Sequence, residues 1–394
     1  MPGKTIVPLA FAVACAASMT AAGAAPYIPA SGAQVLERLP GGLDPARREL
    51  QALRTALSAN PHKLELATAL AQRYIEQSRR DGDPRYLGYA EAALAPWWTQ
   101  AQPPSPVLVL RATLRQSTHQ FGPALDDLAT VLKRDSGNSQ AWLTRATVQL
   151  ITGDAAGARA SCMRLYSRAP ELVVQACLSN VGSVSGQAAA SYERLRQTHA
   201  ARAGSDPALR VWSATLLGEM AARLGRFNAA EAHFREAHAL DAADSYLLGA
   251  YADFLLDRGR AAEVLALLKD KTGADALLLR YAIASKAAGR PDAASAGAEL
   301  AARFDAAMRR RDSVHQREQA RFELALRGNA AAAVRLAKLN WAVQKEPADL
   351  RILAQAAAAS RDPEARAIVR DWVRKSAIED AGLAASLAAL GREA

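Results

Sequence analysis

The sequence predicts an all-α protein, an α-solenoid of about eight antiparallel helix pairs. Half of the 394 residues are hydrophobic but only 6% are aromatic, and alanine dominates, which favours helices packed closely through small side chains. Alternating runs of Val, Ile and Thr, which strands need, are few. In addition, small residues, glycines and prolines recur with a period near 34 residues, as expected for repeated helix pairs.

The N-terminus has the features of a targeting segment. Lys4 precedes an apolar stretch over residues 5–17, and Ala-Gly-Ala at residues 22–24 forms an A-x-A-like cleavage site. The apolar stretch is too short to span a membrane. We therefore expect residues 1–24 to be a signal peptide, cleaved near Ala24, and the mature protein to be periplasmic or secreted.

A different interpretation of this segment stays open. Residues 11–15, "FAVAC", resemble a lipobox with its consensus leucine missing. Acylation at Cys15 would make the protein a lipoprotein anchored to a membrane.

The charge balance excludes little but argues against one class of partner. The chain has 49 basic and 39 acidic residues, and removal of Lys4 with the signal peptide leaves a net charge of +9. A solvated, arginine-rich surface accounts for this excess. Because basic–aromatic motifs are missing, we do not expect nucleic acid as a partner.

Residues 139–172 show the repeated unit most clearly. With Ser139 as position 1, positions 4, 8, 15, 20 and 32 are Trp142, Ala146, Gly153, Ala158 and Pro170. Ala146 and Ala158 are small where two antiparallel helices would cross. Gly153 ends the first helix, Asp154 caps the second, and Pro170 stops it.

The period continues in both directions from this unit. From Val211 the match is close, with Gly218, Gly225 and Phe234 at positions 8, 15 and 24. Other units begin at Ser105, Ser245 and Asp275. Residues 172–205 and 314–347 match less well, and the latter needs about two extra residues in its second helix.

This pattern resembles the tetratricopeptide repeat, which has Trp, small residues and Pro at the same positions. The resemblance covers roughly residues 62–380. It implies a right-handed superhelix in which each helix pair contacts its neighbours and a continuous core runs along the array.

The repeat divides the chain into segments. Residues 25–61 form an N-terminal segment, and residues 62–98 form a first helix pair with about seven extra residues, or two helical turns. Residues 105–347 form the tetratricopeptide-like array. Residues 348–394 are predicted to be capping helices that cover the end of the stack.

A search for catalytic or metal-binding motifs finds none in the sequence: G-x-x-x-x-G-K-[ST], H-E-x-x-H and G-x-S-x-G do not occur. His233 and His238 are five residues apart, so on a helix they point in different directions and would not share a metal. The sequence thus predicts a non-enzymatic protein without a cofactor. The alternative is an enzyme, or an accessory subunit of one, acting on envelope polymer.

Two cysteines remain after signal cleavage, in a compartment that favours disulfides. Cys162 lies on the second helix of one unit and Cys177 on the first helix of the next, at similar distances from the intervening turn. We predict a disulfide between them, with two buried free thiols as the alternative.

The resemblance also implies a concave groove lined by positions 2, 5, 9, 12 and 13 of each first helix. Those positions give Asn180, Trp212, Thr215, Glu219, Arg223, Tyr246, Asp253 and Asp257. The family's carboxylate clamp needs a lysine at position 5, which is missing, so an acidic tail is not the expected ligand. Trp212 and Tyr246 would instead anchor apolar side chains, and the acidic residues would receive basic ones. Solvated helix residues without a ligand are the alternative.

The densest basic run, residues 308–321, includes Arg309, Arg310 and Arg311. It is either a solvated helix or a contact for an acidic partner or an anionic membrane surface. Together these features predict an exported scaffold that binds a partner protein or peptide in its groove, in the assembly of an envelope, secretion or maturation complex.

Overall fold

The computed structural model describes residues 31, 34, 45–310 and 314–391. Residues 1–48 and 49–394 are two separate units, and the description below concerns the second. The expected signal peptide, Cys15 and Arg311 lie outside the described residues. Within the described ranges the ordered elements are all helices, as predicted.

The elements follow one another with short connections. Their bounds are α1 Pro45–Ala59, α2 Leu64–Asp81, α3 Arg85–Trp98, α4 Ser105–Ser117, α5 Phe121–Arg134, α6 Ser139–Ile151, α7 Ala155–Met163, α8 Glu171–Ser183, α9 Ala188–Ala201, α10 Pro207–Arg223, α11 Phe227–Leu240, α12 Ser245–Asp257, α13 Ala261–Leu267, α14 Asp275–Ala287, α15 Ala293–Arg309, α16 Gln316–Ala325, α17 Ala330–Val343, α18 Pro347–Ser360, α19 Pro363–Ser376, the 3₁₀ turn η1 Ala381–Leu383 and α20 Ala384–Gly391.

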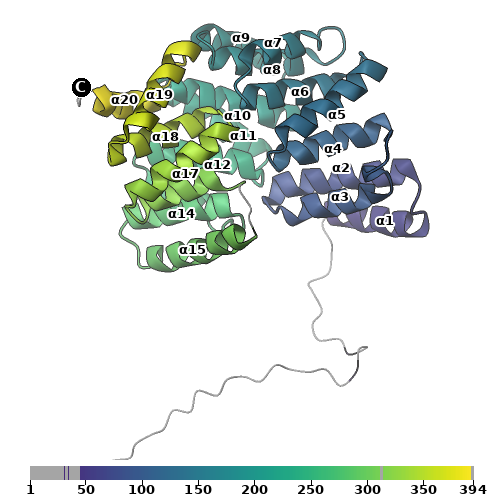
Figure 1. The fold of residues 1–394 in the computed structure, drawn as a ribbon, viewed down its shortest axis with the longest axis horizontal. Coiled ribbons are helices and arrows are strands. Elements are labelled where there is room, and N and C mark those ends of the chain that lie inside the picture. The colour runs from purple at the N-terminus through teal and green to yellow at the C-terminus, as the bar shows by residue number, and fades with distance from the viewer. Residues whose placement is uncertain (1–30, 32–33, 35–44, 311–313, 392–394) are drawn as a thin grey trace, which may run out of the picture. The chain divides into compact units, whose positions relative to one another are not determined.

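Helices α2 to α19 form nine antiparallel pairs in the described part of the chain, each even-numbered helix packing on the odd-numbered helix that follows it (Figure 1). The sequence predicted about eight pairs, with capping helices in residues 348–394. In that segment α18 and α19 form the last pair, and η1 and α20 follow it.

The turn inside every one of these nine pairs contains one residue with positive φ: Gly82, His119, Gly153, Gly186, Gly225, Gly259, Gly289, Gly328 and Arg361. This left-handed residue lets the chain reverse after an inner helix while its last carbonyls still receive hydrogen bonds. In the third pair, for example, the Asp154 N–H donates to the Gln149 carbonyl at 2.8 Å. The recurrence of glycine at position 15 of the sequence unit therefore has a backbone cause.

The core of each pair depends on close approach at position 8. A Cβ added to Gly218 of α10 would lie 2.8–2.9 Å from the ring of Phe234 on α11, so glycine is required there by packing. Phe234 is 1% exposed and stacks on Tyr251 of α12, with ring centroids 5.3 Å apart. Burial of one such side chain contributes about 1.5–3 kcal/mol, so this stack ties two pairs together.

One helix boundary differs from the sequence prediction. The repeat unit was predicted to begin at Val211, but its first helix, α10, begins four residues earlier, at Pro207. Asp206 accepts a hydrogen bond from the Ala208 N–H, and Pro207 occupies the first helical position, where its missing N–H costs nothing. This cap extends the helix without changing the packing register of Gly218.

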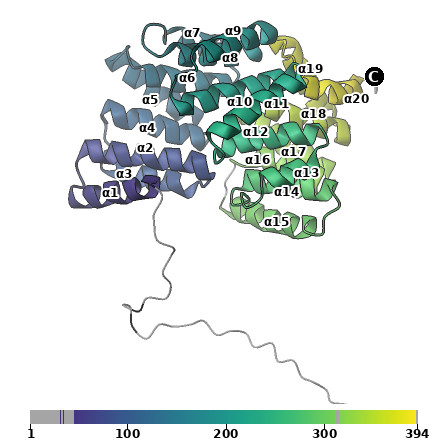
Figure 2. The same ribbon diagram turned by 180° about the vertical axis from the view of Figure 1, so that it is seen from behind.

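Within the second unit, pairs far apart in the sequence also meet. The start of α12 lies beside the end of α2, where the Ser245 hydroxyl donates to the Arg79 carbonyl at 2.5 Å. Figure 2 shows these two helices from behind. The Lys345 N–H donates to the Ile151 carbonyl at 2.7 Å. A Cβ on Gly153, whose φ is 89°, would lie 2.8 Å from the Trp372 ring. The array thus curves strongly enough for its later pairs to touch its earlier ones.

Candidate protein-interaction groove

Charged side chains of even-numbered helices meet on the inner side of this curve. Asp253 of α12 accepts hydrogen bonds from Arg280 of α14 and from Arg321 of α16, each at 2.5 Å. One turn further along α12, Asp257 accepts from Arg351 of α18, also at 2.5 Å. We call these five residues the inner cluster.

The inner cluster surrounds a cavity of about 80 Å³. Leu279, Glu318, Ile352 and Gln355 also line it. This volume holds a few water molecules and is too small for a peptide. As the structure stands, the groove that the sequence predicted is therefore occupied by side chains of the chain itself.

The pKa values of Asp253 and Asp257 shift in opposite directions. Burial alone would raise the pKa of Asp253, but Arg280 and Arg321 together outweigh burial and lower it to about 2. At Asp257 burial is the larger effect, and its pKa is raised although Arg351 acts against the shift. Two guanidinium groups thus outweigh the desolvation of Asp253, whereas one does not outweigh the desolvation of the partly exposed Asp257.

Tyr246 is the exposed aromatic side chain of this inner face. It is 61% exposed, and its hydroxyl donates to Glu219 of α10 at 3.0 Å. Burial raises the pKa of Glu219, and the Glu219 carboxylate in turn raises the pKa of Tyr246 well above its ordinary value. Charges on Glu346 and Arg317 also act on Tyr246, so its hydroxyl faces the C-terminal pairs.

A second ionic group fastens α16 to α18. Arg317 lies 2.9 Å from Glu346 and 3.4 Å from Asp349. Asp349 is fully buried, accepts from Asn340 at 2.8 Å and closes a capping box at the start of α18 with Glu346. His119, in the turn after α4, also lies within the field of Arg317, and burial lowers its pKa.

The residues that the sequence assigned to the groove differ in the structure in how far they are buried. Thr215 is 2% exposed and its hydroxyl donates to the Val211 carbonyl, so its assignment to a contact surface is corrected. Trp212 is half-buried and packs against two apolar cores. One core joins the third and fourth pairs, and the other is centred on the fifth and sixth. It therefore has a packing partner on both sides.

Two other residues of that set lie where α8 meets α10. Arg223 donates to the Ser183 hydroxyl at 3.0 Å, and that hydroxyl donates to the Asn180 carbonyl at 2.8 Å. Tyr246 and Asp257 are the members of the predicted set that stay exposed. Of the predicted groove, the structure thus brings Glu219, Tyr246, Asp253 and Asp257 together.

The arginines of the inner cluster were not among the residues predicted from the sequence. One signal was present: Arg321 occupies position 8 of the unit counted from residue 314, where the well-matched units have Ala or Gly. In the structure the fully buried Ala320 takes this place against α17. Arg321, which could not pack there, instead contacts Asp253.

A Ser–His–Glu constellation forms between α9, α10 and α11. His199 Nδ1 lies 2.8 Å from the Ser213 hydroxyl, and its Nε2 lies 2.9 Å from Glu236. A catalytic serine must reach its substrate. Ser213 is fully buried and its hydroxyl donates to the Leu209 carbonyl at 2.9 Å, so this group is a structural polar network.

The described residues contain no group of three His, Cys, Asp or Glu side chains that could hold a metal ion. None of the helices described here combines the length and apolar character that crossing a bilayer requires.

Of the predicted basic contact, Arg309 and Arg310 are exposed at the C-terminal end of α15.

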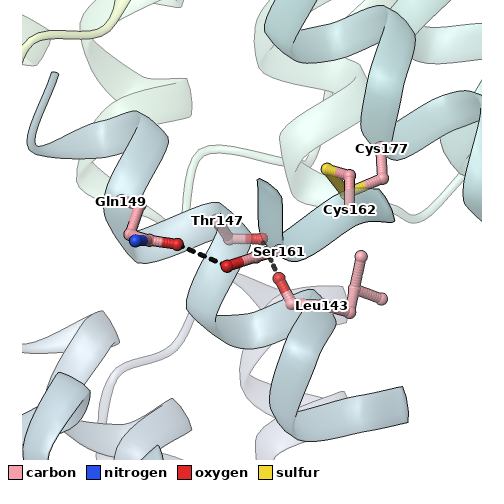
Figure 3. Close-up of a disulfide and its surroundings, with 6 residues drawn as sticks. All are labelled: Leu143, Thr147, Gln149, Ser161, Cys162 and Cys177. Carbon is pink, nitrogen blue, oxygen red and sulfur yellow. Dashed lines mark hydrogen bonds between the residues drawn. A yellow bond between two sulfur atoms is a disulfide. The ribbon is translucent and has the colours of Figure 1, made fainter. Parts of the chain in front are cut away.

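Figure 3 shows the disulfide between Cys162 of α7 and Cys177 of α8, the pair named from the sequence. Both side chains are buried, in an apolar cluster that includes Ala146, Ala158 and Leu165. Beside it the Ser161 hydroxyl donates to Gln149 at 2.6 Å. The bond joins the third pair to the fourth.

Comparisons with known proteins find structural similarities only. No family model matches the sequence, and no curated protein matches it. A tetratricopeptide repeat protein from Parabacteroides merdae is similar in structure, with 14% identity over 73% of this chain and 98% of that one and a TM-score of 0.37. Yeast Tom70 is 11% identical over 88% and 91% of the two chains, with a TM-score of 0.31.

The TPR domain of P58(IPK) is 13% identical over 80% of this chain and 93% of that one, with a TM-score of 0.22. TM-scores as low as these do not establish a fold, so the fold is identified from the helix pairs themselves. On its own register, turns and packing, the chain is an all-α solenoid that resembles the tetratricopeptide repeat.

Proposed function

We propose that this chain is a non-enzymatic scaffold that binds a segment of a partner protein on the inner face formed by α10, α12, α14, α16 and α18. The observation that carries the proposal is the exposure of Tyr246, whose side chain is 61% exposed although the charges of Glu219, Glu346 and Arg317, from three helix pairs, act on it. Tyrosine is enriched where proteins bind one another, because it offers a large apolar face and a polar tip.

The charges around Tyr246 favour a particular kind of segment. Glu219, Asp253 and Asp257 are suited to basic side chains, and the tyrosine ring is suited to an apolar one. A second contact, for an acidic partner or an anionic membrane surface, would use the exposed Arg309 and Arg310 at the end of α15, together with Arg311.

Export is part of the proposal. Its support is the N-terminal segment, with Lys4, the apolar stretch and the cleavage motif ending at Ala24, and the Cys162–Cys177 bond, which suits an oxidising compartment. In such a compartment the scaffold would serve the assembly of an envelope, secretion or maturation complex. Mass measurement of the mature N-terminus distinguishes cleavage after Ala24 from acylation at Cys15, and an intact Met1 in the cytosol contradicts export.

Photo-crosslinking tests the binding face. A photoreactive phenylalanine analogue replaces Tyr246 in the full chain, and the matched control places it at Ala232, which is exposed on the outer helix α11. We expect one discrete protein adduct from position 246 and none from position 232. Adducts that are equal at both positions, or that form only at 232, would move the binding face to the outer helices.

A further inference from the structure

The inner cluster joins parts of the chain that are distant in sequence. Arg321 is 68 residues from Asp253, and Arg351 is 94 residues from Asp257. Their contacts cross from the sixth pair to the eighth and ninth pairs. Neighbouring pairs share apolar cores, whereas these long-range contacts are made by guanidinium and carboxylate groups.

One of the two distant arginines is incompletely satisfied where it lies. Among the described residues, the buried Nε of Arg351 has no hydrogen-bond partner. Asp380, the second carboxylate near Arg351, is 3.5 Å from it, at the limit of a hydrogen bond. Arg351 thus keeps a donor that its present position on α12 does not use.

The array also packs loosely just before these pairs. Each earlier outer helix packs closely on the next inner helix, but α15 approaches α16 less closely, with Phe304 packed edge to face on Phe322 at a centroid distance of 5.5 Å. An open cavity of about 380 Å³ lies there, lined by small residues of α15 and by Phe322 and Leu326 of α16. The Lys286 ammonium, donating to the Ala325 and Leu326 carbonyls at 2.8 and 2.9 Å, bridges α14 to α16 beside it. Phe304 and Phe322 are both buried, so a shift of α16 relative to α15 has to preserve or break this aromatic contact.

We propose that Arg321 and Arg351 act as an internal ligand, occupying on α12 the two carboxylates that receive basic side chains of the partner segment. The inference rests on the proposed function and specifies its ligand: an extended segment with two arginines or lysines. Asp253 and Asp257 are one helical turn apart, about 6 Å along the axis. Alternate residues of an extended strand are separated by about the same distance, so basic residues at positions i and i+2 match the two carboxylates.

Occupation by the chain's own arginines lowers the affinity for the partner. A segment binds only the fraction of molecules in which Asp253 and Asp257 are free, so its apparent dissociation constant rises as that fraction falls. Removing the internal ligand removes this competition. The same substitution leaves Arg280 on Asp253, which keeps that carboxylate from becoming an unpaired buried charge.

The test uses the full chain and a fluorescent synthetic peptide, Gly-Ser-Arg-Ser-Arg-Ser-Gly, with binding measured by anisotropy at low salt. We expect Arg321→Ala/Arg351→Ala to bind it at least tenfold more tightly than the unmodified chain. Adding Asp253→Asn/Asp257→Asn should abolish that gain. Because the chain has a net charge of +10, binding of a basic peptide requires a local acidic site.

The matched control is Arg196→Ala/Arg202→Ala. It removes the same charge and also frees acidic side chains, but from exposed pairs with Glu193 and Glu171. An equal gain in the control, or no gain in Arg321→Ala/Arg351→Ala, overturns the inference. If that variant does not fold, Arg321→Gln/Arg351→Gln replaces it.

Hydrogen exchange gives a readout that needs no ligand. Exchange in residues 316–360 of the unmodified chain should rise as salt is raised from low to high, and Arg321→Ala/Arg351→Ala should show that faster exchange at low salt. Salt-independent exchange contradicts the inference. Failure of the proposed function is distinct: it would appear as the lack of a protein adduct at position 246, whatever the peptide result.

Discussion

Two regions that share α12 differ in how they are held. On one side of α12, Tyr251 stacks on the buried Phe234, which itself fills the space over Gly218. On the other side, Asp253 and Asp257 bind arginines from the eighth and ninth pairs. The apolar contact is made between neighbours and is lost only with the fold. The ionic contact is partly solvated, so salt, pH or a competing cation weakens it.

The largest effect should come from the covalent link between neighbours. The Cys162–Cys177 bond closes a loop of 15 residues, and its removal in Cys162→Ala/Cys177→Ala should lower the free energy of unfolding by about 3 kcal/mol. Denaturant melts measure the loss. Thiol titration of the unreduced, denatured chain should find no free thiol, and two reactive thiols would contradict the bond.

The apolar contact can be broken at position 8. Gly218→Leu drives a side chain into Phe234 and should cost roughly 1–3 kcal/mol through overpacking, and Ala252→Leu should act similarly in the next pair. Thermal melts measure both. Gly122→Ala is the control, because nothing lies within 4 Å of a Cβ there. An unchanged melting temperature for Gly218→Leu would show that the packing register is wrong.

The ionic contact should respond to acid. The pKa of Asp253 is about 2 in the fold, below its ordinary value of 3.8, so the stabilisation is present above pH 3.8 and is lost as pH falls towards 2. The difference amounts to about 2 kcal/mol. Raised pKa values at Glu219 and Asp257 act in the opposite sense, since protonation favours the fold there.

Comparison with Asp253→Asn isolates this effect. Between about pH 4 and pH 2 the unmodified chain should lose more stability than Asp253→Asn, as measured by urea melts at each pH. Parallel curves for the two proteins would mean that Asp253 is not held by its arginines.

The smallest effect should come from an exposed ion pair. The side chains of Arg202 and Glu171 are 56% and 60% exposed, so Arg202→Ala should change stability by less than about 1 kcal/mol. Thermal melts compare it with Arg321→Ala. A larger loss for Arg202→Ala than for Arg321→Ala would reverse the distinction between inner and outer ion pairs.

Much of the fold could be predicted because the determinants of a helix pair are local. The period of small residues located the crossing at Gly218, and the recurring glycines located the left-handed turns. Two turns escaped this reasoning, since His119 and Arg361 adopt positive φ without being glycine. Turn geometry there is imposed by the helices on both sides, and the sequence shows no sign of it.

The candidate site was predicted less completely, for a physical reason. Position within a unit identified Glu219, Tyr246, Asp253 and Asp257, but it placed the buried Thr215 on the same surface. It also could not name Arg321 or Arg351 as the groups that contact α12. The sequence by itself determined the helix pairs, their turns and the cores that neighbours share. Which distant pairs meet was decided by the tertiary structure, because the curvature of an array is the sum of small rotations between successive pairs.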